Sequence, residues 1–199
     1  MEVLINAGGK GTRMGPCGVE KPMQIIGGSP VIMRVVNAMR TSKRIERVIV
    51  SVSPNTRGTK RYLEENGVET IETSGEDFVD DLHRSFEVMN GKFVLTSPSD
   101  LPLLKNYTVD AFVDFFKPSM ESAIAVVDEY VVRSTGIVPS YTVSIDNKNW
   151  VLSGLCIMDR EKTLNGTYLK ETYFKTDWAD LAVNVNTQLE LDLARGFYD

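Results

Sequence analysis

Apolar residues recur along the first half of the chain in two alternating patterns. The apolar run at residues 3–5 is typical of a short buried strand, and further strands are predicted at residues 47–53, 68–72 and 92–97. Between them, apolar residues at helical spacing predict helices, as over residues 32–39 and 78–89. This strand and helix order predicts a parallel sheet covered on both faces, because crossovers between parallel strands are right-handed.

The pattern is less regular in the second half. A helix is predicted over residues 109–116 and a strand over 122–129, and short extended pieces at 142–145, 150–154 and 155–159 suit a hairpin or a sheet edge. The stretch VNVNT, residues 183–187, ends another predicted strand before a closing helix. We therefore predict one domain over residues 1–199, a three-layer, doubly wound α/β fold with a mostly parallel sheet and a small antiparallel portion.

Composition excludes several classes of protein. The apolar fraction of 42% and charged fraction of 25% are ordinary for a soluble globular protein. Neither a run of about 18 apolar residues nor a basic leader is present, so we expect no membrane insertion and a cytoplasmic location. The net charge of −5 argues against nucleic acid as a partner. Cys17 and Cys156 lack metal-ligand spacing and have only His83 as an imidazole partner, so we expect reduced thiols.

The stretch NAGGKGTRMG, residues 6–15, follows the first predicted strand. It does not fit the ATPase P-loop, in which a lysine and a hydroxyl follow the last glycine. The dinucleotide fingerprint fails as well, because Met14 stands where its third glycine is required and residues 51–53 offer no ribose-binding acid. Glycines that can form an anion nest, with Lys10, Arg13 and the later Lys21, predict a polyphosphate site. The alternative is a tight glycine turn with solvated cations.

The sequence AGGKGTRMG followed by EKP resembles the signature of nucleotidyltransferases that activate sugar phosphates and cofactor precursors, a superfamily that includes molybdopterin guanylyltransferases. The segments SPNT, ETSGEDFVDDL, LTSPSDLPLL and VNVNT extend the similarity over most of the chain, to archaeal guanylyltransferases of cobalamin nucleotide-loop assembly. The resemblance implies the Rossmann-like nucleotidyltransferase fold, with transfer of GMP from GTP to adenosylcobinamide phosphate and release of pyrophosphate. The chain departs from the pattern at Asn6, where Met or Leu is more usual, and in two extra residues between Gly15 and Lys21.

Asp100 follows the fourth predicted strand. In a sheet wound 3-2-1-4 that strand neighbours the first, so the carboxylate would share the crevice of the glycine loop. A carboxylate there suits Mg²⁺, and the resemblance implies metal ligation by Asp100 and Asn186. The alternatives are a turn aspartate and a helix N-cap. Asn184 and Gly154 are candidates for contact with the acceptor.

The remaining site residues are implied by the resemblance. Arg13, Lys21 and Asp100 are the expected catalytic residues. Asp80 or Asp81 is a candidate acceptor for the donor edge of guanine, and the alternative is that both carboxylates belong to a solvated helix face. The expected nucleotide-binding residues are Ala7, Gly8, Gly9, Lys10, Gly11, Thr12, Arg13, Ser53, Asn55, Thr73, Ser74 and Gly75.

The expected chemistry is in-line attack of the acceptor phosphate on the α-phosphorus of GTP. Such a transfer depends on positioning and charge neutralisation, and an already ionised phosphate needs no general base. GTP and a corrinoid phosphate are thus the expected partners, and a homodimer is an open alternative to a monomer. Tyr130, Tyr141 and Trp150 would contact the acceptor, form a dimer interface or belong to the core. Competing functions are nucleotidyl transfer to molybdopterin or a sugar or polyol phosphate, and a non-catalytic nucleotide sensor.

Overall fold

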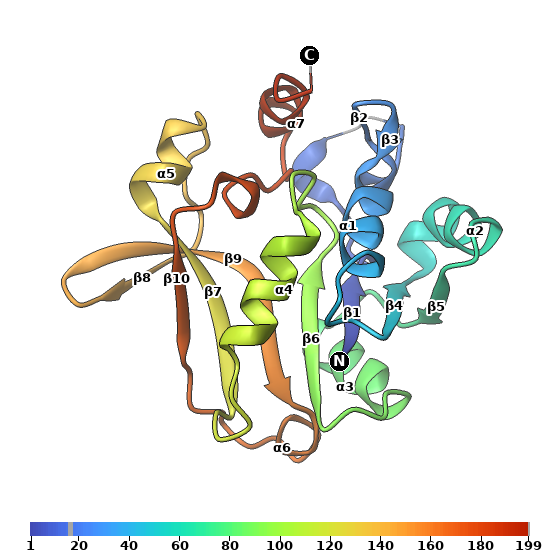
Figure 1. The fold of residues 1–199 in the computed structure, drawn as a ribbon. Helices are drawn as coiled ribbons and strands as arrows, with labels where there is room; N and C mark the ends of the chain where they lie inside the picture. Colours follow the sequence, from blue (N-terminus) through green and yellow to red (C-terminus); the bar gives the residue numbers. More distant parts are fainter. Residues whose placement is uncertain (16–17, 199) are drawn as a thin grey trace.

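A computed structural model describes residues 1–15 and 18–198 and is built around one 8-stranded sheet (Figure 1). Along this sheet the strand order is β10-β7-β9-β6-β1-β4-β5, and β8 pairs with β9 beside it. The strands are β1 (Glu2–Asn6), β4 (Arg47–Val52), β5 (Glu69–Glu72), β6 (Phe93–Pro98), β7 (Ser122–Asp128), β8 (Thr142–Ile145), β9 (Lys148–Asp159) and β10 (Tyr173–Thr176). A separate pair joins β2 (Ile25–Ile26) to β3 (Ser29–Pro30).

The parallel half of the sheet confirms the predicted winding. β1 pairs in parallel with both β4 and β6, and β4 pairs in parallel with β5. The antiparallel portion is also confirmed, because β9 runs antiparallel to β6, β7 and β8. Two of the predicted short pieces, at 150–154 and 155–159, are halves of the single long strand β9. A register shift between Ile124 and Val126 of β7 faces Gly154 of β9, where φ is +89°.

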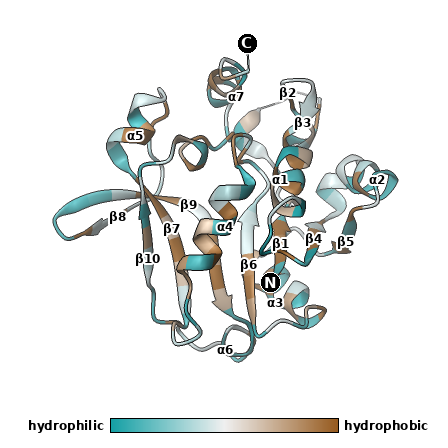
Figure 2. Cartoon of the chain, viewed as in Figure 1, coloured by the Kyte–Doolittle hydropathy of each residue, from teal (hydrophilic) through white to brown (hydrophobic). Residues whose placement is uncertain are grey.

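Helices cover both faces of the sheet. α1 (Val31–Arg40) and α4 (Asn106–Phe115) pack on one face, and α3 (Phe78–Glu87) with α6 (Arg160–Leu164) lies on the other. The remaining helices are α2 (Arg57–Glu65), α5 (Glu129–Ser134) and α7 (Gln188–Arg195), with four short 3₁₀ segments at Thr12–Met14, Lys21–Met23, Pro54–Thr56 and Ala179–Leu181. Figure 2 shows hydrophobic residues concentrated on the central strands and hydrophilic ones on α2 and β8.

The predicted strand ending at residues 183–187 is wrong. This segment is extended but forms no strand, and Val185 N donates a single hydrogen bond of 2.9 Å to the Asp100 carbonyl. Val183 and Val185 are fully buried, whereas Asn184 and Asn186 are half-buried. The same alternation of buried and half-buried residues is the signal of a strand, so the pattern predicted one, although no described strand pairs with this segment.

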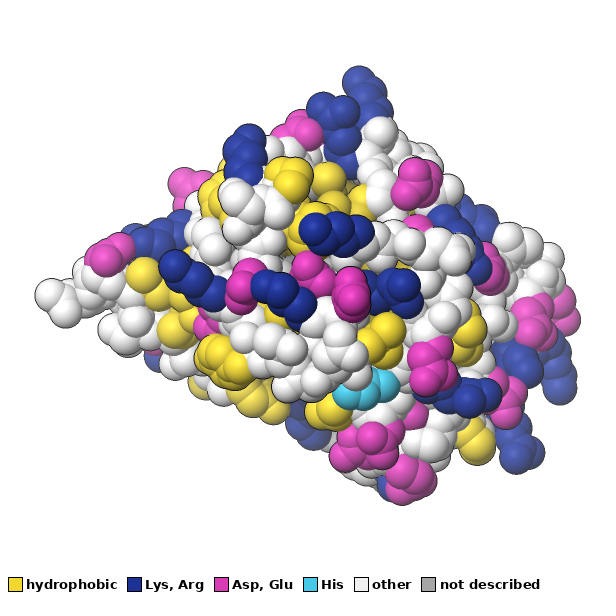
Figure 3. Space-filling view, turned by 90° about the horizontal axis from the view of Figure 1, so that it is seen from below, with side chains coloured by type: hydrophobic (Ala, Val, Ile, Leu, Met, Phe, Trp, Pro, Cys, Tyr) yellow, Lys and Arg dark blue, Asp and Glu magenta, His cyan; other side chains and the backbone are white. Residues whose placement is uncertain are grey.

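The structure also describes one of the two thiols, the distribution of charge and the length of the helices. Cys156 is a free thiol whose pKa burial raises to about 12, while Cys17 lies outside the described residues. Seen from the end of the sheet where the parallel strands begin, basic and acidic side chains are interleaved (Figure 3). Within the described residues, no helix is long and apolar enough to cross a membrane.

Candidate active site

The glycine loop turns away from β1 at the centre of the sheet. Ala7 N donates to the Ser51 carbonyl at 2.9 Å, which continues the pairing of β1 with β4 for one more residue. Gly11 then adopts a left-handed φ of +62° and starts the 3₁₀ turn Thr12–Met14, a conformation that favours glycine. Beside the loop lies a cavity of about 290 Å³, called here the phosphate cavity. It is lined by Asn6, Ala7, Gly9, Lys10, Gly11, Thr12, Arg13, Lys21, Pro22, Pro98, Ser99, Asp100 and Asn186.

Lys21 joins three segments at the wall of the phosphate cavity. Its Nζ lies 2.5 Å from Asp100 Oδ2 and 2.8 Å from Asn186 Oδ1. Asn184 Nδ2 donates to the other Asp100 oxygen at 3.2 Å and to the Ser153 carbonyl at 3.4 Å. The Asp100 residue is only 8% exposed, so this carboxylate depends on protein donors rather than on water.

The same oxygens fit a divalent cation. Asp100 Oδ2 and Asn186 Oδ1 already converge on one positive charge, the Lys21 ammonium, and both are the hard donors that Mg²⁺ prefers. No group of three or more His, Cys, Asp or Glu side chains that could hold a metal ion occurs in the described part of the chain, so an ion here would need water and substrate phosphates to complete its coordination. Thr187, not Asn186, is the N-cap of α7, in a capping box with Glu190. The helix-cap alternative for Asn186 is therefore wrong.

A larger cavity, about 550 Å³, lies on the α3 side of the glycine loop and is called here the nucleoside cavity. Its wall includes Gly8, Gly9, Lys10, Thr73, Gly75, Asp81, Pro98 and Gly154. Its floor is polar: Asn6, Ser51 and Thr96 lie two residues beyond Leu4, Ile49 and Val94, which form the core beneath α3. Three adjacent strands thus change from apolar to polar at their carboxyl ends, on the same face. This floor was not predicted, although a polar residue two positions after a buried one is its signal.

The wall of the nucleoside cavity is tied together by short polar contacts. The Asp81 carboxylate accepts from Ser74 N at 2.8 Å, Ser74 Oγ at 2.7 Å and Gly75 N at 2.9 Å. Ser53 Oγ donates to the Gly8 carbonyl at 2.7 Å, and Asn55 Nδ2 lies 3.4 Å from the Gly75 carbonyl. Ser53 and Asn55 therefore link the glycine loop to the turn at residues 74–75, and Asp81 fixes that turn on α3.

Gly75, Asp80 and Asp81 were all expected near the base, and their surroundings differ. Gly75 has φ of +70°, and a Cβ there would lie 2.5 Å from Ser53 Oγ, so no other residue fits this close approach. Asp80 is exposed on α3, whereas Asp81 lines the nucleoside cavity while holding the 74–75 turn. Lys10 pairs with Glu76 at 2.7 Å on the exposed rim.

A third cavity, about 310 Å³, adjoins the phosphate cavity and is called here the acceptor cavity. One wall is apolar and the other polar. The apolar wall consists of Val132, Ile137, Val138, Pro139, Val151 and Leu152, and the polar wall includes Arg13, Asp100, Ser153, Asn184, Asn186 and Glu190. Gly154 and Pro98 separate this cavity from the nucleoside cavity, since both residues line both.

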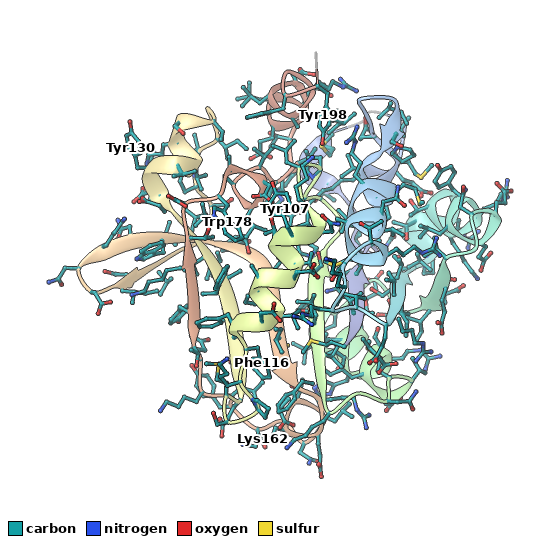
Figure 4. All side chains as sticks on the ribbon, in the orientation of Figure 1. Tyr107, Phe116, Tyr130, Lys162, Trp178 and Tyr198 are labelled. Carbon is teal, nitrogen blue, oxygen red and sulfur yellow. The ribbon has the colours of Figure 1, made fainter. Side chains whose placement is uncertain are left out.

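The three aromatic residues of the second half have different environments. Tyr141 lines the acceptor cavity and is exposed. Tyr130 projects outward from α5 (Figure 4) and is 78% exposed. Trp150 lies half-buried on the β8–β9 hairpin, with Lys148 Nζ 4.7 Å from its ring centroid. Of the three, only Tyr141 is placed to contact a molecule in the acceptor cavity.

One polar residue that sequence reasoning missed lies immediately before Lys21. The Glu20 carboxylate accepts hydrogen bonds from Gly58 N, Thr59 N and Thr59 Oγ1, at 2.8, 2.6 and 2.6 Å. It thereby binds the first turn of α2, which is almost forty residues away in the chain. Nothing in a single sequence pairs these two segments.

The chain is similar to known proteins in sequence, family and fold. Residues 3–144 match the model of the MobA-like NTP transferase domain. Adenosylcobinamide-phosphate guanylyltransferase of Methanocaldococcus jannaschii is 31% identical over 205 residues, which cover 98% of this chain and 95% of that protein.

Solved structures of low sequence identity share the fold. A putative glucose-1-phosphate thymidylyltransferase of Bacillus anthracis superimposes with a TM-score of 0.74 at 14% identity, covering 100% of this chain and 95% of that one. CMP:2-keto-3-deoxy-manno-octonic acid synthetase, solved with CTP, gives a TM-score of 0.73 at 13% identity and covers 98% and 97%. On the family match and the full-length relative, this chain is a nucleotidyltransferase and belongs to the MobA-like NTP transferase family.

Proposed function

We propose that this protein transfers GMP from GTP to adenosylcobinamide phosphate, with release of pyrophosphate. The observation that carries the proposal is the meeting of two cavities: Arg13, Asp100 and Asn186 line both the phosphate cavity and the acceptor cavity. A phosphate held in the acceptor cavity would therefore face the α-phosphate of a nucleotide held along the glycine loop. In-line transfer requires this juxtaposition.

Each charged group has a role in this scheme. Lys10, Arg13 and the glycine-loop amides would bind the β- and γ-phosphates, and Lys21 would neutralise charge at the α-phosphate as the pyrophosphate leaves. Asp100 and Asn186 would hold Mg²⁺, which supplies further charge neutralisation on the phosphate oxygens. The attacking acceptor phosphate is ionised at neutral pH, so the scheme needs no general base.

The walls of the other two cavities support the choice of substrates. The nucleoside cavity, with its polar floor and the Asp81 carboxylate in its wall, suits a base that has both donors and acceptors, such as guanine. The apolar wall of the acceptor cavity offers contacts to the methyl groups of a corrinoid ring, which a sugar phosphate lacks. The relative that matches 98% of this chain is named as a guanylyltransferase of adenosylcobinamide phosphate, which supports the proposal at the level of sequence.

The test is to incubate the full-length protein with Mg²⁺, adenosylcobinamide phosphate and each nucleoside triphosphate in turn. We expect pyrophosphate and a guanylylated corrinoid with GTP, measured by phosphate release and mass spectrometry. Val138→Asp places a charge on the apolar wall at a residue that is 72% exposed, so it should raise the KM for the corrinoid and leave the KM for GTP unchanged. Product with molybdopterin or a sugar phosphate alone would contradict the acceptor, and binding of GTP without any turnover would favour a sensor.

A further inference from the structure

The carboxylate of Glu20 fixes the backbone next to Lys21. Its three contacts, with Gly58 N, Thr59 N and Thr59 Oγ1, are all 2.8 Å or shorter. The first N–H groups of a helix have no partner within the helix, and the helix dipole favours a negative charge beside them. The N-cap residue of α2, Thr56, makes no side-chain cap hydrogen bond, so Glu20 supplies this cap from a distant segment.

The backbone of Glu20 and the side chain of Lys21 extend this link from α2 to the glycine loop. Glu20 is the N-cap of the 3₁₀ turn Lys21–Met23, and its carbonyl accepts from Met23 N at 2.9 Å. On the other side, a Cβ at Gly11 would lie 3.3 Å from Lys21 Cβ, so the base of the lysine packs against the glycine loop. Lys21 therefore leaves a backbone held between α2 and the glycine loop before its Nζ reaches Asp100.

We propose that Glu20 is a positioning residue for Lys21, holding the lysine backbone on α2 so that the ammonium faces the transferred phosphate. The proposal rests on the role given to Lys21 under the proposed function. Without the carboxylate, α2 and the lysine turn lose their three shared hydrogen bonds, and Lys21 samples positions away from the phosphate. Transition-state stabilisation falls while the glycine loop still binds GTP. We thus expect kcat to fall by about tenfold in Glu20→Ala, with the KM for GTP changed by less than about threefold.

The contact between Glu20 and α2 also requires a small residue at Gly58. A Cβ at this position would lie 3.1 Å from Glu20 Oε1, which is tight enough that the carboxylate must shift by a few tenths of an ångström. Gly58→Ala therefore displaces the carboxylate without removing it. The expected loss in kcat has the same sign as in Glu20→Ala but is smaller.

A double-mutant cycle separates positioning of Lys21 from simple stabilisation of α2. Glu20→Ala is measured in the wild-type chain and in Lys21→Met, by kcat for pyrophosphate release. If Glu20 acts through Lys21, the tenfold loss disappears in the Lys21→Met background, where no ammonium remains to be positioned. An equal loss in both backgrounds would overturn the proposal. Glu20→Gln, which keeps one acceptor oxygen, should recover part of kcat.

Two further measurements complete the experiment. Asp159→Ala removes the carboxylate that caps α6, at the opposite end of the sheet, and should lower stability without lowering kcat. Amine labelling followed by peptide mass spectrometry reads the position of Lys21 without catalysis, because its side chain is 17% exposed and paired with Asp100. Glu20→Ala should raise the labelling rate of Lys21 several-fold relative to the other lysines. If the wild-type chain showed no turnover, the proposed function would fail, and an unchanged labelling rate would separately overturn the role of Glu20.

Discussion

Replacing Lys21 by methionine separates the structural from the catalytic contribution of one ion pair. The Lys21 and Asp100 side chains are 17% and 11% exposed, and their charged atoms are 2.5 Å apart. Methionine has nearly the length of lysine without the ammonium, so the variant leaves the Asp100 carboxylate with Asn184 as its remaining side-chain donor. An uncompensated buried charge is the main cost.

The expected magnitude follows from this burial. Removing one partner of a fully buried pair costs about 3–5 kcal/mol, and the partial exposure of Lys21 favours the lower end, about 3 kcal/mol. For a domain of this size, about 3 kcal/mol corresponds to a fall in Tm of roughly 6–12 °C. Turnover should fall on the order of a hundredfold, the effect of losing one electrostatic stabiliser, and Asp100→Ala should lower it similarly.

The assay compares wild type, Lys21→Met, Asp100→Leu and the double variant by urea unfolding and by pyrophosphate release. In the double variant both charges are gone, so its free energy of unfolding should exceed that of Lys21→Met by about 2 kcal/mol, because apolar replacement of a buried pair is often nearly neutral. Turnover should stay low in all three variants. The reasoning is refuted if the two single losses of stability simply add, or if Lys21→Met retains near-normal turnover.

Three other predictions concern glycine geometry, thiol reactivity and pH. Gly154→Ala combines a left-handed φ with a Cβ 2.8 Å from Pro98 Cγ, so urea unfolding should show a loss of about 2 kcal/mol or more. Because burial raises the pKa of Cys156 to about 12, iodoacetamide should label it far more slowly in the native than in the denatured chain; comparable rates by peptide mass spectrometry would contradict this. Burial raises the pKa of the Glu2 carboxyl, but hydrogen bonds led by Gly91 N–H outweigh it and the net pKa is lowered. The stabilisation by the Glu2 carboxylate is therefore present above about pH 4.5 and lost as pH falls through the folded pKa. Glu2→Gln should lower the free energy of unfolding by about 2 kcal/mol at pH 7, and this difference from the wild type should shrink in unfolding curves measured in acid.

The parallel half of the fold was predictable because its signals are local. β1 contains a continuous apolar run, residues 3–5, and α1 and α3 each have one apolar face, so the winding of β5, β4, β1 and β6 follows from the order of these elements along the chain. The signals in the C-terminal half of the chain are weaker. The short elements β10, α5 and α6 have four to six residues each, too few to show a period.

The site was predictable where it depends on the ends of parallel strands. Asp100 and the glycine loop follow neighbouring strands, and this alone places them in one crevice. The polar floor at Asn6, Ser51 and Thr96 combines residues from three strands, each of which alone reads as an ordinary strand end. Asn6, which departs from the family's pattern, is part of this floor, and its Oδ1 accepts from Ser51 Oγ at 3.3 Å.

The length of the segment before Lys21 bears on how this chain keeps the lysine in place. The resemblance predicts that the chain has two more residues between Gly15 and Lys21 than the family's pattern. If loop length set the reach of the lysine, the insertion would displace its ammonium by several ångströms, because each residue spans up to about 3.5 Å. Lys21 Nζ nevertheless lies 2.5 Å from Asp100. The contacts of Glu20 with α2 fix the residue next to Lys21, so they can hold Lys21 independently of the number of residues that precede Glu20. Deleting two residues between Gly15 and Glu20 should therefore cost less activity than removing the Glu20 carboxylate.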